Sequence, residues 1–204
     1  MSATLQAVER VPLVTDVNRP SRAEVEAAIR TIIRWTGDDP ERDGLIETPG
    51  RVVRALEEFY VGYAQDPVEI LLKAFRQAGD YDGMIVLRGI CVESHCEHHM
   101  QPITGRAWVA YVPADRVVGI SKLARVVEVY AKRLQTQEKL TAQIANTIND
   151  VLKPMGVGVI IKASHRCMTA RGVSKPNTDL VTSHMLGCFR DNILIRQEFL
   201  GIAV

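Results

Sequence analysis

Four consecutive residues near the middle of the chain, Cys96-Glu97-His98-His99, are of types that bind metal ions or move protons. Cys96 and His99 form a Cys-x-x-His pair, and a two-residue spacer allows a tight turn to present both side chains to one ion. A single pair of this kind is weak evidence, because a buried thiol beside a surface histidine produces the same pattern. The pair predicts a metal site only if further ligands come from elsewhere.

Further ligands are available in the stretch His165-Arg166-Cys167. Its histidine and cysteine are two residues apart in a predicted strand over 156–168, where alternate side chains point to the same face. Histidine is scarce, with five in 204 residues, and four of the five lie within four residues of Cys96 or Cys167. This clustering predicts that the two distant stretches contribute to one site.

The ligand set favours zinc. It has three members, Cys96, His99 and Cys167, and two thiolates with one imidazole suit zinc best. A structural zinc site has four protein ligands, whereas a catalytic site leaves one position open for water. Three ligands therefore predict a catalytic site, with His98 and His165 as proton carriers and a zinc-activated water as nucleophile.

The other cysteines and histidines have simpler interpretations. Cys91 and Cys188 are expected to be buried, unreactive thiols. His95 could support a neighbouring metal ligand, but a packing role explains it as well. His184 receives no role.

A second group of residues could hold an anion. In the heptapeptide GISKLAR, Ser121 is predicted where a helix begins, and Lys122 and Arg125 share one helical face. A helix N-terminus with two cations suits phosphate, although a solvated basic face has the same pattern. Arg171 follows Cys167 by four residues and adds a cation near the metal, as a phosphorylated substrate would require.

Gln137 and Glu138 could recognise a guanine base. A carboxylate can accept both adjacent N–H donors of the guanine edge, and an amide can serve the neighbouring atoms. The competing interpretation is two polar residues in a turn between helices.

The period of the apolar residues predicts the elements that position these groups. A capping box at Ser21 and Glu24 begins the first helix, and the second has Thr48 as its cap with Pro49 in the first helical position. Helices come first along the chain, and strands mixed with helices follow. This order indicates the α+β class. The predicted helices are 21–35, 47–63, 66–77, 121–134, 139–153 and 193–201; the strands are 83–94, 104–113 and 156–168; and 169–192 is irregular.

The same pattern predicts a flexible N-terminal arm over 1–20, a helical region over 21–80 and a catalytic domain over 81–204.

The net charge is +1, with 25 basic and 24 acidic residues, which argues against general nucleic-acid or membrane binding. No apolar run resembles a signal peptide or reaches the ~20 residues that span a bilayer. We therefore expect a cytoplasmic protein with reduced cysteines.

Taken together, these stretches resemble the GTP cyclohydrolase type I family. The resemblance rests on CEHHMQPITGRAWVAYVP, VVGISKLARVVEVYAKRLQTQEKLTAQIA, SHRCMTARGV, TSHMLGCFRDN and RQEFL, which occur in this order. It extends from about Glu47 to Phe199. It implies hydrolysis of GTP to 7,8-dihydroneopterin triphosphate and formate, the first step of folate and pterin biosynthesis, by attack of a zinc-activated water on C8 of the purine.

The resemblance also implies a role for each matching residue. By this resemblance, Cys96, His99 and Cys167 hold one zinc ion per subunit, His98 transfers protons, His165 contacts the purine and ribose, and Ser121 acts near the ribose or triphosphate. Glu138 anchors the guanine, with Gln137 near it. Lys122, Arg125 and Arg171 bind the triphosphate, and Arg51 reaches the phosphates from a neighbouring subunit.

For the fold, the resemblance implies a tunnelling fold, in which an antiparallel sheet carries two helices on one face. Subunits of such proteins assemble into a ring-shaped barrel, usually a homodecamer with active sites at subunit interfaces. Two alternatives stay open. One is a variant cyclohydrolase that stops at a formamide, and the other is a zinc-stabilised nucleotide-binding module without catalysis.

Overall fold

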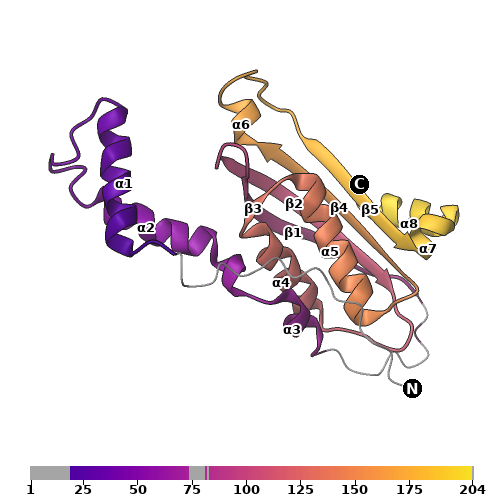
Figure 1. Cartoon of the computed structure of the whole chain (residues 1–204). Helices are drawn as coiled ribbons and strands as arrows, with labels where there is room; N and C mark the ends of the chain where they lie inside the picture. Colours follow the sequence, from indigo (N-terminus) through magenta and orange to yellow (C-terminus); the bar gives the residue numbers. More distant parts are fainter. Residues whose placement is uncertain (1–18, 74–80, 82, 204) are drawn as a thin grey trace.

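The structure is a computed structural model that describes residues 19–73, 81 and 83–203 (Figure 1). The predicted arm over 1–20 and part of the predicted helix over 66–77 lie outside the described residues. The strands are β1 (Ile85–Cys96), β2 (Pro102–Val112), β3 (Leu134–Gln135), β4 (Gly156–His165) and β5 (Leu180–Gly187). The helices are α1 (Arg22–Trp35), α2 (Thr48–Phe59), the 3₁₀ turn η2 (Val61–Ala64), α3 (Pro67–Leu71), α4 (Ile120–Ala131), α5 (Gln137–Leu152), α6 (Arg166–Thr169), α7 (Cys188–Asp191) and α8 (Ile193–Ala203).

The five strands form one sheet in the order β3-β1-β2-β4-β5. The four long strands pair in antiparallel fashion, as the resemblance implied for the sheet, although β5 was not among the predicted strands. The short strand β3 was not predicted and runs parallel to β1, with His95 opposite Leu134 and Cys96 opposite Gln135. Since β3 lies between α4 and α5 in the chain, it brings the end of β1 next to the start of α5.

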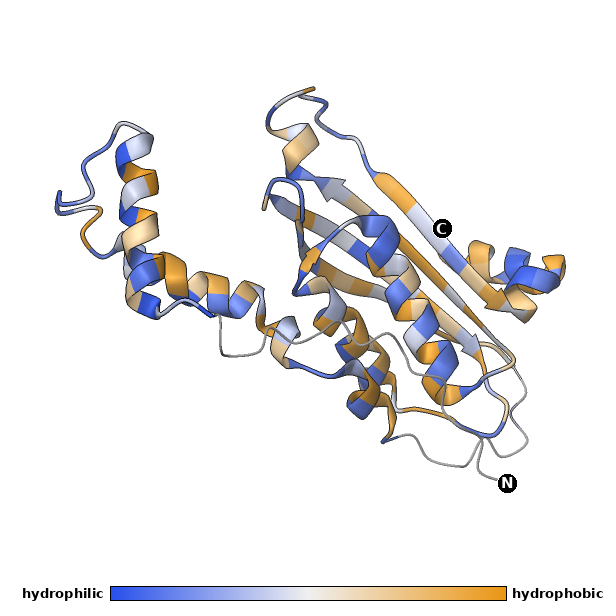
Figure 2. Cartoon of the chain, in the orientation of Figure 1, coloured by the Kyte–Doolittle hydropathy of each residue, from blue (hydrophilic) through white to orange (hydrophobic). Residues whose placement is uncertain are grey.

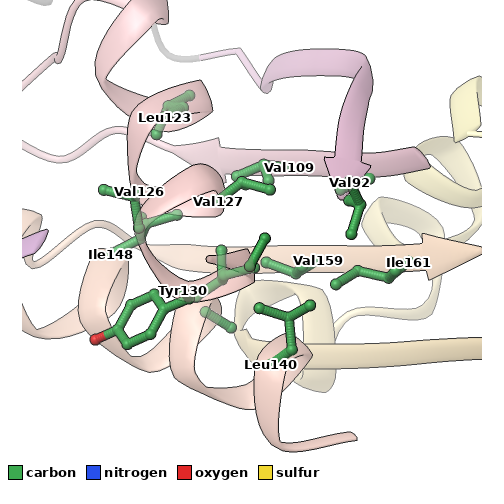
Figure 3. Close-up of a cluster of buried hydrophobic side chains, with 14 of the residues drawn as sticks. Val92, Val109, Leu123, Val126, Val127, Tyr130, Leu140, Ile148, Val159 and Ile161 are labelled. Atoms are coloured by element: carbon green, nitrogen blue, oxygen red, sulfur yellow. The ribbon is translucent and has the colours of Figure 1, made fainter. Parts of the chain in front are cut away.

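One face of the sheet is covered by α4 and α5, and the main core lies between these layers (Figure 3). Side chains alternate across a strand, so Val109 of β2 and Val159 and Ile161 of β4 point to the same face. They meet Leu123 and Val127 of α4, and all five side chains are buried. The predicted α+β class, with two helices on one face of the sheet, is confirmed for this layer.

The opposite face carries a smaller core that the sequence did not predict. Phe189 of α7 and Phe199 of α8 are fully buried there and pack edge to face, with ring centroids 5.5 Å apart. They lie against β4 at Gly158, where an added Cβ would come within 2.8 Å of either ring. Helices on one face alone are therefore an incomplete description, because α7 and α8 cover part of the other face.

The two N-terminal helices lie apart from the sheet (Figure 1). The predicted capping box of α1 is present at Ser21 and Glu24. In α2, Pro49 lies in the first turn as predicted, but Glu47 rather than Thr48 occupies the cap position, and it makes no side-chain cap bond.

The helical region is attached to the sheet domain through α3, whose Leu71 is fully buried in the main core, and through η2. The Arg133 guanidinium donates to the carbonyl oxygens of Gly62 (3.0 Å) and Gln65 (3.1 Å) and lies over the rings of Tyr63 and Tyr130. Gly62 packs so closely on the end of α4 that an added Cβ would approach the Val129 carbonyl oxygen within 2.1 Å. This contact fixes where the N-terminal helices leave the domain.

Three predicted boundaries were wrong, and each matters for the site. The predicted strand 156–168 ends at His165, and α6 follows. The segment 169–192, predicted irregular, contains β5 and α7. Helix α5 begins two residues early, because Thr136 caps it by accepting from the backbone N–H of Lys139. Among residues 19–73, 81 and 83–203, no helix is long and apolar enough to span a bilayer.

Candidate metal and nucleotide site

The turn after β1 presents the CEHH stretch. Two backbone hydrogen bonds of 2.8 Å close it, from Cys96 N–H to Gln101 O and from Met100 N–H to Cys96 O. Met100 adopts a φ of 53°, a left-handed conformation that few non-glycine residues adopt. The turn buries Cys96 and leaves His98 and His99 exposed.

Cys96, His99 and Cys167 converge. Their candidate ligand atoms all lie within 4.8 Å of one another, and they form the group found among the described residues that could hold a metal ion. Burial raises the pKa of the Cys167 thiol, and the adjacent Cys96 raises it further. Two thiols this close ionise together most readily around a cation, so the donor set fits zinc.

Cys167 reaches this cluster in a different way from the one predicted. The sequence placed His165 and Cys167 on one face of a strand, but the strand ends at His165 and Cys167 lies in α6. The helical turn brings Cys167 to Cys96 and His99, whereas His165 makes its hydrogen bond with Gln137. The two side chains therefore have separate environments.

His98 lies beside the ligand cluster. Its Nδ1 is 3.9 Å from Cys96 Sγ, and its ring is nearly perpendicular to that of His99, with centroids 6.3 Å apart. Because His98 is exposed, its ring can exchange protons with solvent while remaining next to the ligands.

Contacts that the sequence did not predict tie this turn to α5. The backbone N–H of Glu97 donates to Gln135 O of β3 at 3.0 Å. The Glu97 carboxylate lies 3.5 Å from Lys139 Nζ in the first turn of α5. No local pattern signals either contact, since both depend on the parallel pairing of β3 with β1.

His95 has the packing role that was one of its two interpretations. Its ring lies against Phe59 and Tyr60, with centroids at 4.7 and 5.4 Å, and burial lowers its pKa. Cys91, expected to be buried, is exposed, because it points to the face opposite Val92, away from α4 and α5. Cys188 is half-buried, so the prediction of burial is only partly met.

The start of α5 brings Gln137, Glu138 and His165 together. Gln137 is fully buried, and its Oε1 lies 2.9 Å from His165 Nε2. Burial lowers the pKa of His165, and the negative charge of Glu138 acts in the opposite direction. Glu138 is exposed, so its carboxylate is free to meet a ligand beside the histidine.

The predicted anion-binding residues are spread over the chain. Gly119 is the cap residue of α4, and Ser121 and Lys122 lie in its first turn. Helix α4 rises 1.5 Å per residue, so Ser121 lies roughly 15 Å from the end of α4 that leads to β3 and Cys96. One chain thus does not bring Ser121 and Lys122, in the first turn of α4, to the metal cluster, and Arg125 lies halfway along this helix.

The two remaining arginines differ from each other. Arg171 is exposed and lies near enough to Cys167 for its positive charge to act against the rise in the pKa of that thiol. Arg51 lies on α2, apart from the sheet, where it forms an ion pair with Glu47.

The fold and this geometry define a class: an α+β protein with a Cys₂His set that could hold a metal ion and a further histidine, His98, beside it. The comparisons with known proteins identify the family within this class. The family model described as GTP cyclohydrolase I matches residues 25–203. The chain therefore belongs to the GTP cyclohydrolase I family, and it is an enzyme of the hydrolase class.

Two relatives are similar over almost their whole length. "GTP cyclohydrolase 1" of Hyphomonas neptunium (strain ATCC 15444) is 50% identical over 192 residues, which cover 94% of this chain and 93% of the relative. "GTP cyclohydrolase 1" of Maricaulis maris (strain MCS10) is 52% identical over 184 residues, 90% of each. A solved structure titled "Crystal structure of the archaeosine synthase QueF-Like in the apo form" covers 51% of this chain and 93% of its own at 18% identity, with a TM-score of 0.42, too low to support an argument.

Proposed function

We propose that this chain converts GTP and water to 7,8-dihydroneopterin triphosphate and formate in a zinc-dependent reaction. Membership of the GTP cyclohydrolase I family supports the substrate. The observation that carries the mechanism is the convergence of Cys96, His99 and Cys167, within 4.8 Å of one another, with His98 beside them.

Cys96, His99 and Cys167 would hold one zinc ion per subunit. A zinc ion with three protein ligands supplies a Lewis acid that lowers the pKa of water, which is the nucleophile that hydrolysis at C8 of a purine needs. The residues of the chain supply the proton transfers and the binding contacts.

His98 is the proton carrier in this proposal. C8 of the purine is a weak electrophile, and protonation of N7 makes it more reactive. An exposed imidazole next to the ligands can deliver that proton and recover it near neutral pH. His165 contacts the purine and ribose region, and Ser121 assists in the later opening of the ribose ring.

Glu138 would bind the guanine edge by accepting from N1–H and from the exocyclic amine. Its carboxylate is exposed at the first turn of α5 and close enough to His165 to influence the pKa of that ring. A base without these donors would leave the carboxylate unpaired, which gives strong discrimination. Lys122, Arg125, Arg171 and Arg51 would bind the triphosphate.

The positions of these cations support a site shared between copies of the chain. Lys122, with Ser121 next to it, lies in the first turn of α4, remote from the metal cluster; Arg125 lies halfway along α4; and Arg51 lies on α2, away from the sheet. We therefore propose a homo-oligomer, a decamer in which the tunnelling-fold sheets join into a ring-shaped barrel. Each active site then takes its metal ligands from one subunit and part of its cations from others. We also propose a cytoplasmic location.

The first test measures formate and pterin released from GTP by the purified, zinc-loaded protein. We expect both products, their loss on chelation, and their return when zinc is added back. Cys96→Ala should lose both products and bound zinc together. Formate without a pterin would indicate a variant cyclohydrolase. Binding of GTP by folded, zinc-loaded protein without formate would instead indicate a nucleotide-binding module and contradict the proposal.

A further inference from the structure

We infer that Gln137 is a positioning residue for His165, and that its side chain holds this histidine in one orientation and one tautomer instead of contacting the guanine. The inference rests on the proposed function, because it concerns how His165 serves that reaction. It reassigns Gln137, which sequence reasoning placed among the substrate-binding residues.

The amide nitrogen of Gln137 is fully engaged within the protein. Nε2 lies 3.0 Å from Ile161 O, 2.9 Å from Leu180 O and 3.1 Å from Thr182 Oγ1. Two of these three partners are backbone carbonyl oxygens, which only accept hydrogen bonds. The amide therefore has a single sensible orientation, with its NH₂ group directed at β4 and β5.

The orientation of this amide determines which nitrogen of His165 carries a proton. The Oε1 of Gln137 faces His165 Nε2 at 2.9 Å. An amide oxygen only accepts, so Nε2 of the ring must be the donor. In the neutral ring, Nδ1 is then the nitrogen without a hydrogen, which can accept a hydrogen bond from a ligand.

A second layer of hydrogen bonds keeps Gln137 in place. Thr141 Oγ1 donates to the backbone carbonyl of Gln137 at 2.6 Å and lies 2.7 Å from Thr182 Oγ1. Since the Thr141 hydroxyl proton is already used, Thr182 must donate to Thr141, and its oxygen shares one of the two hydrogens of Gln137 Nε2 with a backbone carbonyl oxygen. Gln137 and Thr141 are buried, so breaking this network would leave unpaired polar groups inside the protein.

This network connects three elements at the site. Gln137 begins α5, Ile161 belongs to β4, and Leu180 and Thr182 belong to β5. A guanine could reach the Gln137 amide only by displacing protein partners from a fully buried side chain. The exposed neighbour Glu138 has no such obstacle, so the base contact belongs to Glu138 and the histidine contact to Gln137.

The test is a double-mutant cycle in the full-length, zinc-loaded enzyme with Gln137→Met and His165→Ala. Methionine keeps the length of the side chain and removes its hydrogen bonds. We expect Gln137→Met to lower kcat for formate release by about 10–100-fold, the usual effect of losing a partner that orients a functional histidine. KM for GTP should change by less than about threefold. In the His165→Ala background the same substitution should change kcat by less than about threefold, because residues that act through one another are not additive.

Two outcomes would overturn the inference. A large rise in KM at constant kcat would show that the amide contacts GTP directly. An undiminished effect in the His165→Ala background would show that Gln137 does not act through His165. The matched control is Gln135→Met, since Gln135 is also a buried glutamine, but its amide donates to Tyr130 O and Gln143 Oε1. It should lower the melting temperature similarly and leave kcat near wild type, and an equal loss of kcat would point to packing alone.

A spectroscopic measurement separates this inference from the proposed reaction. Solid-state ¹⁵N NMR of the zinc-loaded protein with ring-labelled histidine, at a pH where the ring is neutral, should show His165 protonated at Nε2. The resonance is assigned by its absence in His165→Ala. In Gln137→Met the preference for this tautomer should be lost. If the protein releases no formate from GTP, the proposed function fails, and the tautomer still tests the contact. A wild-type His165 ring protonated at Nδ1 would refute the inferred hydrogen bond from His165 to Gln137.

Discussion

Helices α5 and α1 have similar amphipathic patterns, but they differ in burial. Nine of the 16 residues of α5 are buried against the sheet and α4, whereas none of the 14 residues of α1 is buried. Apolar side chains of α1 such as Ile32 and Trp35 remain 53% and 86% exposed. Figure 2 shows hydrophobic residues along α1, which lies apart from the sheet. The comparison shows that a periodic apolar face predicts a helix reliably, while the surface that covers this face is a separate matter.

The same contrast applies to the functional residues. In the sheet domain, backbone pairing and buried hydrogen bonds within one chain position Cys96, Cys167 and His165. On the N-terminal helices, Arg51 is exposed and pairs with a neighbouring carboxylate one helical turn away. A residue of the first kind is positioned within the single chain, whereas the role proposed for Arg51 requires a second copy of the chain.

The largest effects should distinguish these two kinds of site residue. Cys96→Ala should reduce formate release by more than about 100-fold, since even the partners of metal ligands contribute 10–100-fold. Arg51→Ala should keep bound zinc and kcat but raise KM for GTP about tenfold, the size of one charge-assisted hydrogen bond. Steady-state kinetics and zinc analysis measure both. Arg54→Ala, on the same exposed helix, is the control, and an Arg51 variant that behaves like it would remove Arg51 from the site.

Core truncation tests the difference in burial directly. Ile144→Ala in α5 removes a fully buried side chain and should lower the free energy of unfolding by about 2–5 kcal/mol. Ile32→Ala in α1 should change it by no more than about 0.5 kcal/mol in the dissociated chain. Denaturant titrations at several protein concentrations measure both values. A loss for Ile32→Ala that grows with protein concentration would show that association buries α1, and the contrast would then apply only to the isolated chain.

The smallest predicted effect is a difference in acid sensitivity. Burial and the nearby Arg190 lower the pKa of His184 in β5 from its ordinary value of 6.5. The unfolded chain then binds this proton more readily, so the contribution of His184 is present above about pH 6.5 and is lost as pH falls below it. On the N-terminal side, the hydrogen bond from Arg42 lowers the pKa of Asp38 to about 2, so its contribution persists to far lower pH.

Thermal melts between about pH 8 and pH 5 test this difference. His184→Gln should flatten the dependence of the melting temperature on pH, and Asp38→Asn should leave its shape unchanged in that range. If both variants keep the wild-type slope, His184 is not a source of acid sensitivity.

Much of the fold and the ligand set could be predicted, because those features depend on local patterns. The periods of α1, α4 and α5 and the long strands are visible in the sequence, and Cys96, His99 and Cys167 stand out by type and spacing. The strand β5 was missed because none of its eight residues is buried and four are exposed, so pairing with β4 rather than an alternating pattern makes it a strand. The separation of His165 from Cys167 was missed because GVGVIIKASHRCM shows no break at the residue where α6 begins.

The role inferred for Gln137 could not be predicted for a related reason. Its partners Ile161, Leu180 and Thr182 are far away in the chain, and two of them contribute backbone oxygens that carry no sequence signature. The position of Glu138 beside His165 follows only once α5 is known to begin at Gln137 and β4 to end at His165. Hydrogen-bonded positions of this kind arise from tertiary structure.

The two-residue strand β3 also has a consequence for folding. It joins Cys96 to a segment almost forty positions later, and Cys167 comes from further along still. Contacts with such separation in sequence form late, because the entropy of closing long loops must be overcome first. A nascent chain would expose the CEHH turn without its second thiol until β4 and α6 had been added. In the proposed enzyme, zinc binding by all three ligands would therefore come at the end of folding, and the metal would not act as a template for its beginning.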